Sequence, residues 1–181
     1  MRPVPFDKIH MVRLRNRAQP PIAPRIPPGH AITDFAVSRV VSPTYDLYWS
    51  LLDRVGGHLG WSSRRQVRDR RLVEGILFDP LTELLDLRVS GATVGYSVAK
   101  FTAALRYEAE IQDFGFFPEH TGRGYGSFFL PGIILRLQDV SDNLTRMLVT
   151  TRSTNGPRVP QFYGRFGFSV FKVVHHDATE H

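Results

Sequence analysis

The sequence of 181 residues contains no cysteine. Disulfide bonds, a thiol nucleophile and thiolate metal ligands are therefore excluded. No apolar run reaches the roughly 18 residues that a membrane-spanning helix needs. The opening stretch "MRPVPFDKIHMVRLRNR" also lacks the apolar core of a secretory signal. We therefore expect a cytoplasmic protein with no membrane partner.

Lysine is scarce as well. Lys8, Lys100 and Lys172 are the only three, although the formal net charge is +6. Arginine carries most of the positive charge, which we interpret as the codon bias of a GC-rich genome. A charge of this sign favours anionic partners such as nucleic acid, anionic lipid or a phosphate-bearing cofactor, and it does not select one of them.

Proline is concentrated near the N-terminus, with five prolines between residues 18 and 29. Proline removes amide donors and favours extended backbone. We therefore expect a proline-rich arm over residues 1–30 and one folded domain over 31–181. Within the arm, residues 8–14 have the pattern of an outlying strand, and residues 18–29 should lie extended without a catalytic group.

Helix and strand signals alternate along the rest of the chain. Ser42 is a candidate N-cap for the first helix, and Gly91 fits a hairpin turn. The expected strands are 31–40, 83–90, 92–101, 107–117, 145–151 and 168–174. The expected helices are 42–57, 63–77, 126–140 and 157–166. This order is typical of a mixed α/β or α+β domain.

A glycine-rich loop, "TGRGYGS", lies between an expected strand and an expected helix, with Gly122, Gly124 and Gly126 at alternate positions. Such a loop serves either a tight turn or the close approach of a ligand to the backbone. The N-terminus of the following helix favours a phosphate or pyrophosphate. No Gly-Lys-Ser/Thr follows, and the spacing differs from the dinucleotide-binding fingerprint.

Two segments together resemble a known family. Residues 118–130, "PEHTGRGYGSFFL", resemble motif A of the GCN5-related N-acetyltransferase (GNAT) superfamily, and residues 162–168, "FYGRFGF", resemble its late motif B. The resemblance covers residues 31–174 and is closest over 107–174. It implies a mixed, mostly antiparallel sheet flanked by helices, with two strands splayed where acetyl-CoA binds. It also implies acetyl transfer to an amine by direct attack, without a metal.

The resemblance implies which residues hold acetyl-CoA. Amides of the glycine loop would bind the pyrophosphate, and the strand end at Phe116 and Phe117 would pair with the pantetheine arm, with Gly115 as a bulge. Asn155 would touch the pantetheine. The implied site comprises Phe116, Phe117, Thr121, Gly122, Arg123, Gly124, Tyr125, Gly126, Ser127 and Asn155. Because the superfamily has Arg or Gln at the position of Thr121, the affinity for acetyl-CoA is an open question. A protein that starts near Pro28 should still bind acetyl-CoA.

The resemblance also implies catalytic groups. Tyr163 matches the tyrosine that protonates the sulfur of the departing CoA, and its alternative role is a core aromatic. Glu110 stands where histone-type members carry the general base, and its alternative role is a surface partner of Arg106. Without a bulge, strand alternation would put Glu110 and Phe116 on one face. Asp113 is the second candidate base.

The acceptor is less defined. Tyr48, His58 and Trp61 lie where the superfamily builds its acceptor pocket, and a small-molecule amine is favoured over a protein amine. The arginine-rich stretch 64–72 is interpreted as the solvated face of a helix rather than as a nucleic-acid patch. A non-catalytic CoA-binding regulatory module is the main alternative function, and a nucleic-acid-binding protein is the second. The protein would be a monomer or a homodimer.

Overall fold

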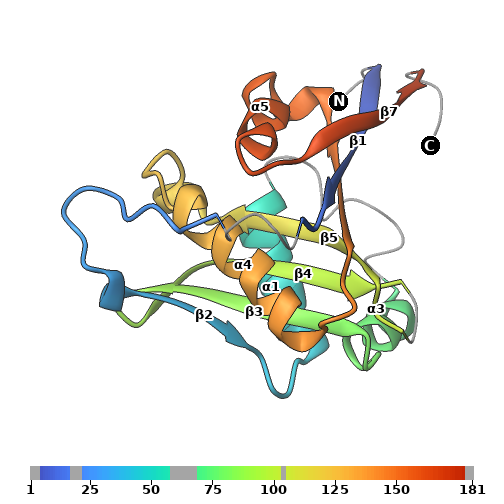
Figure 1. The fold of residues 1–181 in the computed structure, drawn as a ribbon. Helices are drawn as coiled ribbons and strands as arrows, with labels where there is room; N and C mark the ends of the chain where they lie inside the picture. Colours follow the sequence, from blue (N-terminus) through green and yellow to red (C-terminus); the bar gives the residue numbers. More distant parts are fainter. Residues whose placement is uncertain (1–4, 17–21, 58–68, 103–104, 178–181) are drawn as a thin grey trace.

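The computed structural model describes residues 5–16, 22–57, 69–102 and 105–177. Its strands are β1 (Phe6–Leu14), β2 (Phe35–Arg39), β3 (Thr82–Val89), β4 (Ala92–Phe101), β5 (Glu108–Phe116), β6 (Arg146–Arg152) and β7 (Ser169–His176). Its helices are α1 (Tyr45–Gly56), α3 (Arg70–Leu77), α4 (Gly126–Val140) and α5 (Arg158–Gly164), shown in Figure 1. Across these ranges, no helix is both long enough and apolar enough to cross a membrane.

Seven strands form one sheet in the order β2-β3-β4-β5-β6-β1-β7. Among the strand pairs in the described ranges, β5 and β6 alone run parallel. Helix α4 covers one face of the sheet, where Phe129 and Leu130 are buried, and α1 and α3 cover the other face with Leu52 and Val73 (Figure 1). The predicted mixed, mostly antiparallel sheet flanked by helices is therefore confirmed.

Strand β1 lies inside the sheet, between β6 and β7. The expectation of an outlying strand over residues 8–14 is therefore wrong. The sequence allows the interior position because Ile9 and Met11 join the core on one face, while Lys8 and His10 turn to the other. Part of the expected N-terminal arm is thus a structural element of the domain.

The described part of the proline-rich segment, residues 22–29, packs along helix α4. Pro131, inside α4, has no amide to offer the carbonyl of Ser127 four residues earlier. The backbone amide of Arg25 donates to that carbonyl at 3.1 Å, and Ile22 packs against the core. The segment therefore satisfies a carbonyl that the helix itself leaves unpaired.

The helix starts differ in detail from those that the sequence predicts. Thr44, not Ser42, is the N-cap of α1, because its hydroxyl oxygen accepts from the amide of Leu47 at 3.2 Å. Helix α3 begins after the N-cap Asp69, so the first part of the helix expected over 63–77 falls outside the described residues.

Candidate active site

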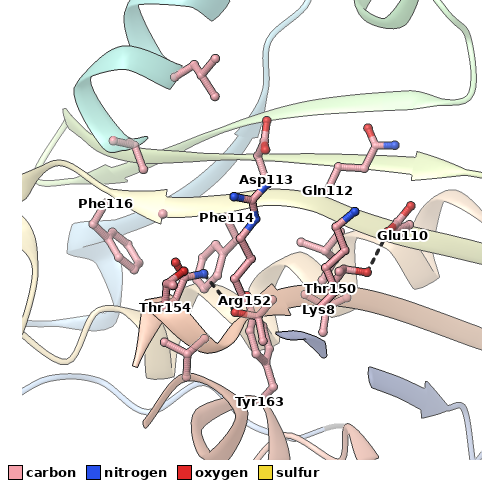
Figure 2. A pocket seen from close by; sticks show the side chains of 18 of the residues that line it. Lys8, Glu110, Gln112, Asp113, Phe114, Phe116, Thr150, Arg152, Thr154 and Tyr163 are labelled. Carbon is pink, nitrogen blue, oxygen red and sulfur yellow. Dashed lines mark hydrogen bonds between the residues drawn. The ribbon is translucent and has the colours of Figure 1, made fainter. Parts of the chain in front are cut away.

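A cavity opens where the neighbouring strands β5 and β6 part. Their parallel pairing runs from Glu108 to Ile111 against Arg146 to Val149 and ends there. The cavity has a volume of about 860 Å³, and residues of α1, α3, β1 and α5 complete its walls (Figure 2). The splayed strands that the sequence predicts are therefore present, and they open onto a space large enough for a small-molecule ligand.

A bulge at Gln112 decides which way the side chains of β5 face. Glu110 lies opposite Lys100 on β4, but Asp113 lies opposite Val98. The step from Glu110 to Asp113 takes three residues along β5, whereas the matching step along β4 takes only two. Gln112 is therefore the extra residue of a bulge. After Gln112, the side chains of β5 again alternate between the two faces of the sheet.

The bulge puts Glu110 and Asp113 on the same face of the sheet and Phe116 on the opposite face, against α4. The expectation that Glu110 and Phe116 share a face is wrong for this reason. Gly115 is not the bulge either, because it pairs in register with Tyr96. Both candidate carboxylates thus face the side of α1 and α3, and both line the cavity.

Asp113 is held by two phenols. The hydroxyl of Tyr48, on α1, donates to its Oδ2 at 2.8 Å, and that of Tyr96, on β4, donates to the same oxygen at 3.3 Å. Neutral donors of this kind stabilise the charged carboxylate. Glu110 has fewer constraints, since its Oε1 accepts from Thr150 at 3.5 Å (Figure 2). The hydroxyl groups around Asp113 fix its position more tightly than that of Glu110.

Tyr163 lies on α5 and lines the opposite wall of the cavity (Figure 2). It is 6% exposed and packs between the rings of Phe162 and Phe168, at centroid distances of 5.4 and 5.7 Å. Burial raises the pKa of the Tyr163 phenol above its ordinary value, because desolvation disfavours the phenolate. Tyr163 is therefore a neutral hydrogen-bond donor that keeps its proton throughout the physiological range.

The glycine loop leads into α4. Gly122 and Gly124 have φ angles of +73° and +80°, a region that favours glycine. Among the described residues, a Cβ on Gly122 would meet no group other than its chain neighbours within 4 Å. Among the described residues, no acceptor pairs with the backbone amides of 122–126. Because the N-terminus of a helix carries about half a positive charge, these amides can bind an anion.

Four donors of three residues expected at this loop are used within it. Both the hydroxyl and the amide of Thr121 donate to the carbonyl of Pro118, at 2.8 and 3.2 Å. The amide of Ser127 donates to the carbonyl of Gly124 at 3.0 Å. Arg123 donates through Nε to a carbonyl of the preceding 3₁₀ turn at 3.0 Å. The backbone amides between Thr121 and Ser127 are therefore the main-chain donors of the loop that have no acceptor among the described residues.

Other residues expected at the acetyl-CoA site serve packing. A Cβ on Gly126 would come to 3.0 Å from the ring of Phe162, so a side chain there would require this ring to shift. The Tyr125 ring is 4% exposed, within an aromatic cluster. Phe117 is 2% exposed and lies under the guanidinium of Arg54, at 3.7 Å from the ring centroid. The rings of Tyr125 and Phe117 therefore do not reach the cavity.

The structure brings together seven of the candidate residues that the sequence singles out. The cavity lining includes Tyr48, Glu110, Asp113, Phe116, Thr121, Asn155 and Tyr163. Asn155 donates through Nδ2 to the hydroxyl of Thr151 at 3.1 Å. Residues 122–127 are not part of the cavity wall, and His58 and Trp61 lie outside the described residues.

The sequence did not point to the wall built by β1 and β6. Lys8 and His10 come from β1, and Thr150 and Arg152 come from β6. Alternation in "KIHM" indicates a half-buried strand, but no local signal shows which strands it pairs with. Among the described residues, no cluster of three or more histidine, aspartate or glutamate side chains could hold a metal ion.

No protein-family model matches this sequence, and no curated protein matches it. Solved structures do match the fold. A GCN5-related N-acetyltransferase from Sphaerobacter thermophilus superposes with a TM-score of 0.67 and 19% identity, over 95% of this chain and 50% of that one. A tandem GNAT protein from the clavulanic acid biosynthesis pathway gives 0.64 and 14%, over 99% and 55%.

An acetyltransferase from Thermus thermophilus matches with a TM-score of 0.52 and 18% identity, over 78% of this chain and 97% of that one. The present chain thus spans about half the length of the first two proteins and most of the length of the third. The shared sheet with its parting strands, together with these superpositions, shows that the chain has the fold of the GCN5-related N-acetyltransferase superfamily.

Proposed function

We propose that this chain is an N-acetyltransferase that transfers an acetyl group from acetyl-CoA to an amine by direct attack. The observation that carries the proposal is the cavity between β5 and β6, which has the phenol of Tyr163 on one wall and the carboxylates of Glu110 and Asp113 on another. Acetyl transfer needs a neutral amine and a proton for the departing thiolate. These groups are suited to both tasks.

Acetyl-CoA is the donor that suits the shape and the chemistry of this region. Strand β5 continues to Phe116 after its pairing with β6 has ended at Ile111, and this edge of the strand could pair with the amides of a pantetheine arm. The unpaired amides of residues 122–126, at the N-terminus of α4, would receive the phosphates. The thioester would then lie in the cavity, near Tyr163.

Replacing Gly122 by alanine should weaken acetyl-CoA binding by about 10- to 100-fold, the equivalent of one or two lost charge-assisted hydrogen bonds. Alanine disfavours the φ of +73° at this position and would turn the loop amides away from the phosphates. Isothermal titration calorimetry measures the affinity.

Gly91→Ala is the matched control for the loop variant. Gly91 has a φ of +81°, and a Cβ added there would meet no other group within 4 Å, but the residue lies in the β3–β4 turn. Both variants should lose about 1–2 kcal/mol of stability, while Gly91→Ala keeps its affinity. Equal affinities for the two variants would place the phosphates elsewhere.

Glu110 is proposed as the base that takes a proton from the acceptor. Glu110→Gln should lower kcat/KM most at low pH, where few amine molecules are neutral, and activity should partly recover as the pH rises. Asp113→Asn should have a smaller effect that does not depend on pH, because the two phenols already hold Asp113 in place. The measurement is kcat/KM against pH for the three proteins. A pH-dependent loss in Asp113→Asn, together with a Glu110→Gln profile parallel to wild type, would transfer the role of base to Asp113.

The acceptor is proposed to be a small-molecule amine with an apolar part. The two carboxylates suit an amine, and the helix wall beside them is apolar, formed by Leu52, Val55 and Val73. Screening amines for acceptor-dependent release of free CoA tests the proposal. Binding of acetyl-CoA without release for any amine would instead support a CoA-binding regulatory module.

A further inference from the structure

We propose that His10, on the N-terminal strand, carries away the proton that Glu110 takes from the acceptor, through the hydroxyl of Thr150. This inference rests on the proposed function. It assigns a catalytic part to a strand that lies far from the GNAT-like motifs in the sequence.

The three side chains form a line across three neighbouring strands. His10 on β1 lies directly opposite Thr150 on β6, and its Nδ1 is 3.1 Å from the hydroxyl oxygen of Thr150. The same hydroxyl is 3.5 Å from Oε1 of Glu110 on β5 (Figure 2). All three residues line the cavity, and each is partly exposed. A proton that reaches Glu110 therefore has a continuous hydrogen-bonded route to an imidazole.

A hydroxyl group suits the middle of this route, because it donates one proton and accepts another. Glu110 takes a proton from the ammonium form of the acceptor and leaves a neutral amine. The protonated carboxyl then donates to the oxygen of Thr150, while the hydroxyl proton of Thr150 passes to Nδ1 of His10. Glu110 is ionised again, Thr150 is unchanged and His10 is an imidazolium, which loses one proton to the solvent.

Charged groups lie near this line on each neighbouring strand. The strand β1 contributes Lys8, β5 contributes Asp113, and β6 contributes Arg152. Lys172 on β7 lies opposite His10, and Lys100 on β4 lies opposite Glu110 and forms an ion pair with Asp79 at 2.9 Å. The ring of Phe171 lies 6.1 Å from that of His10. His10 is the group in this line that can accept a proton at one ring nitrogen and release one from the other.

The kinetic test compares Thr150→Val, Thr150→Ser and His10→Ala with the wild type. Valine keeps the branched shape that suits a strand but breaks the route, so kcat should fall by about 10- to 100-fold. The kcat of His10→Ala should fall by a similar factor, and the kcat of the double variant Thr150→Val/His10→Ala should fall no further. Serine restores the hydroxyl and should restore kcat. Added imidazole should raise kcat of His10→Ala and leave Thr150→Val unchanged, while acetyl-CoA affinity stays the same in all variants.

Lys172→Gln is the control, because it changes the neighbour of His10 on β7 without touching the route. It should keep the wild-type kcat.

A second measurement does not need an acceptor. Ring ¹⁵N NMR of the free protein should show a change in the chemical shift of Nδ1 of His10 in Thr150→Val, because the contact between Nδ1 and the Thr150 hydroxyl at 3.1 Å is lost. The proposal is overturned if the ring ¹⁵N chemical shifts of His10 are the same in both proteins, or if a catalytically active wild type keeps its kcat in Thr150→Val and His10→Ala. A wild type that releases no CoA with any amine would instead refute the acetyltransferase function, and the catalytic role of His10 with it.

Discussion

Replacing Tyr163 by phenylalanine should lower kcat by roughly 10- to 1000-fold, the range of a lost acid–base group. When the tetrahedral intermediate collapses, CoA leaves as a thiolate whose ordinary pKa is near that of cysteine, about 8.5. A buried phenol that keeps its proton can donate to this sulfur, and Tyr163 lines the cavity with its pKa raised by burial. Steady-state and single-turnover kinetics with an identified acceptor measure the loss.

Affinity for acetyl-CoA should change little in Tyr163→Phe, because the hydroxyl contributes mainly when negative charge develops on the sulfur. Tyr107→Phe, at an exposed position outside the cavity, is the control and should keep its kcat. A wild-type rate for Tyr163→Phe in an assay limited by chemistry would exclude the phenol as the acid.

The raised pKa of Tyr163 leads to an expectation about how kcat depends on pH. Because the pKa of Tyr163 is raised in the folded protein, the phenol remains protonated at every pH at which an ordinary tyrosine, with a pKa of about 10, would be protonated. Deprotonation of Tyr163 should therefore cause no loss of kcat below about pH 10. An alkaline limb in this range that disappears in Tyr163→Phe would contradict the neutral, buried donor.

Deleting residues 1–16 should abolish cooperative folding and, with it, acetyl-CoA binding. The deletion removes an interior strand, exposes the backbone edges of β6 and β7, and takes Met11 out of the core. The free-energy cost of the unpaired strand edges and the lost core residue is expected to exceed the free energy of unfolding of a domain of this kind, which is roughly 5–15 kcal/mol. Circular dichroism during thermal unfolding tests this expectation. It replaces the expectation that a protein starting near Pro28 retains the site.

Two point variants within β1 serve as a graded control. Met11 is 2% exposed and Leu14 is 68% exposed. Met11→Ala should cost about 2–5 kcal/mol of unfolding free energy, and Leu14→Ala should stay within about 0.5 kcal/mol of wild type. Equal small effects for both, or a cooperatively folded deletion protein, would show that β1 is dispensable.

Local chemistry allowed much of the fold to be predicted. Helix α4 runs over the range expected from its apolar pattern, and the β3–β4 hairpin turns at Gly91, where the φ of +81° requires glycine. Helix α4 and the hairpin depend on residues close together in the sequence, whose conformational preferences act before the chain is packed. The parting of β5 and β6 and the candidates Tyr163 and Glu110 were instead implied by the resemblance to the GNAT superfamily.

The tertiary structure alone decided three things, all through pairing between distant residues. It placed β1 between β6 and β7, so that His10 came to the cavity. It inserted the bulge at Gln112, which turned Asp113 to the same face as Glu110. It buried Tyr163 beneath the cavity. Strand order and register are set by the side chains that meet across the sheet. The two-residue period of a single strand is the same for every partner and every register, so by itself it does not identify either.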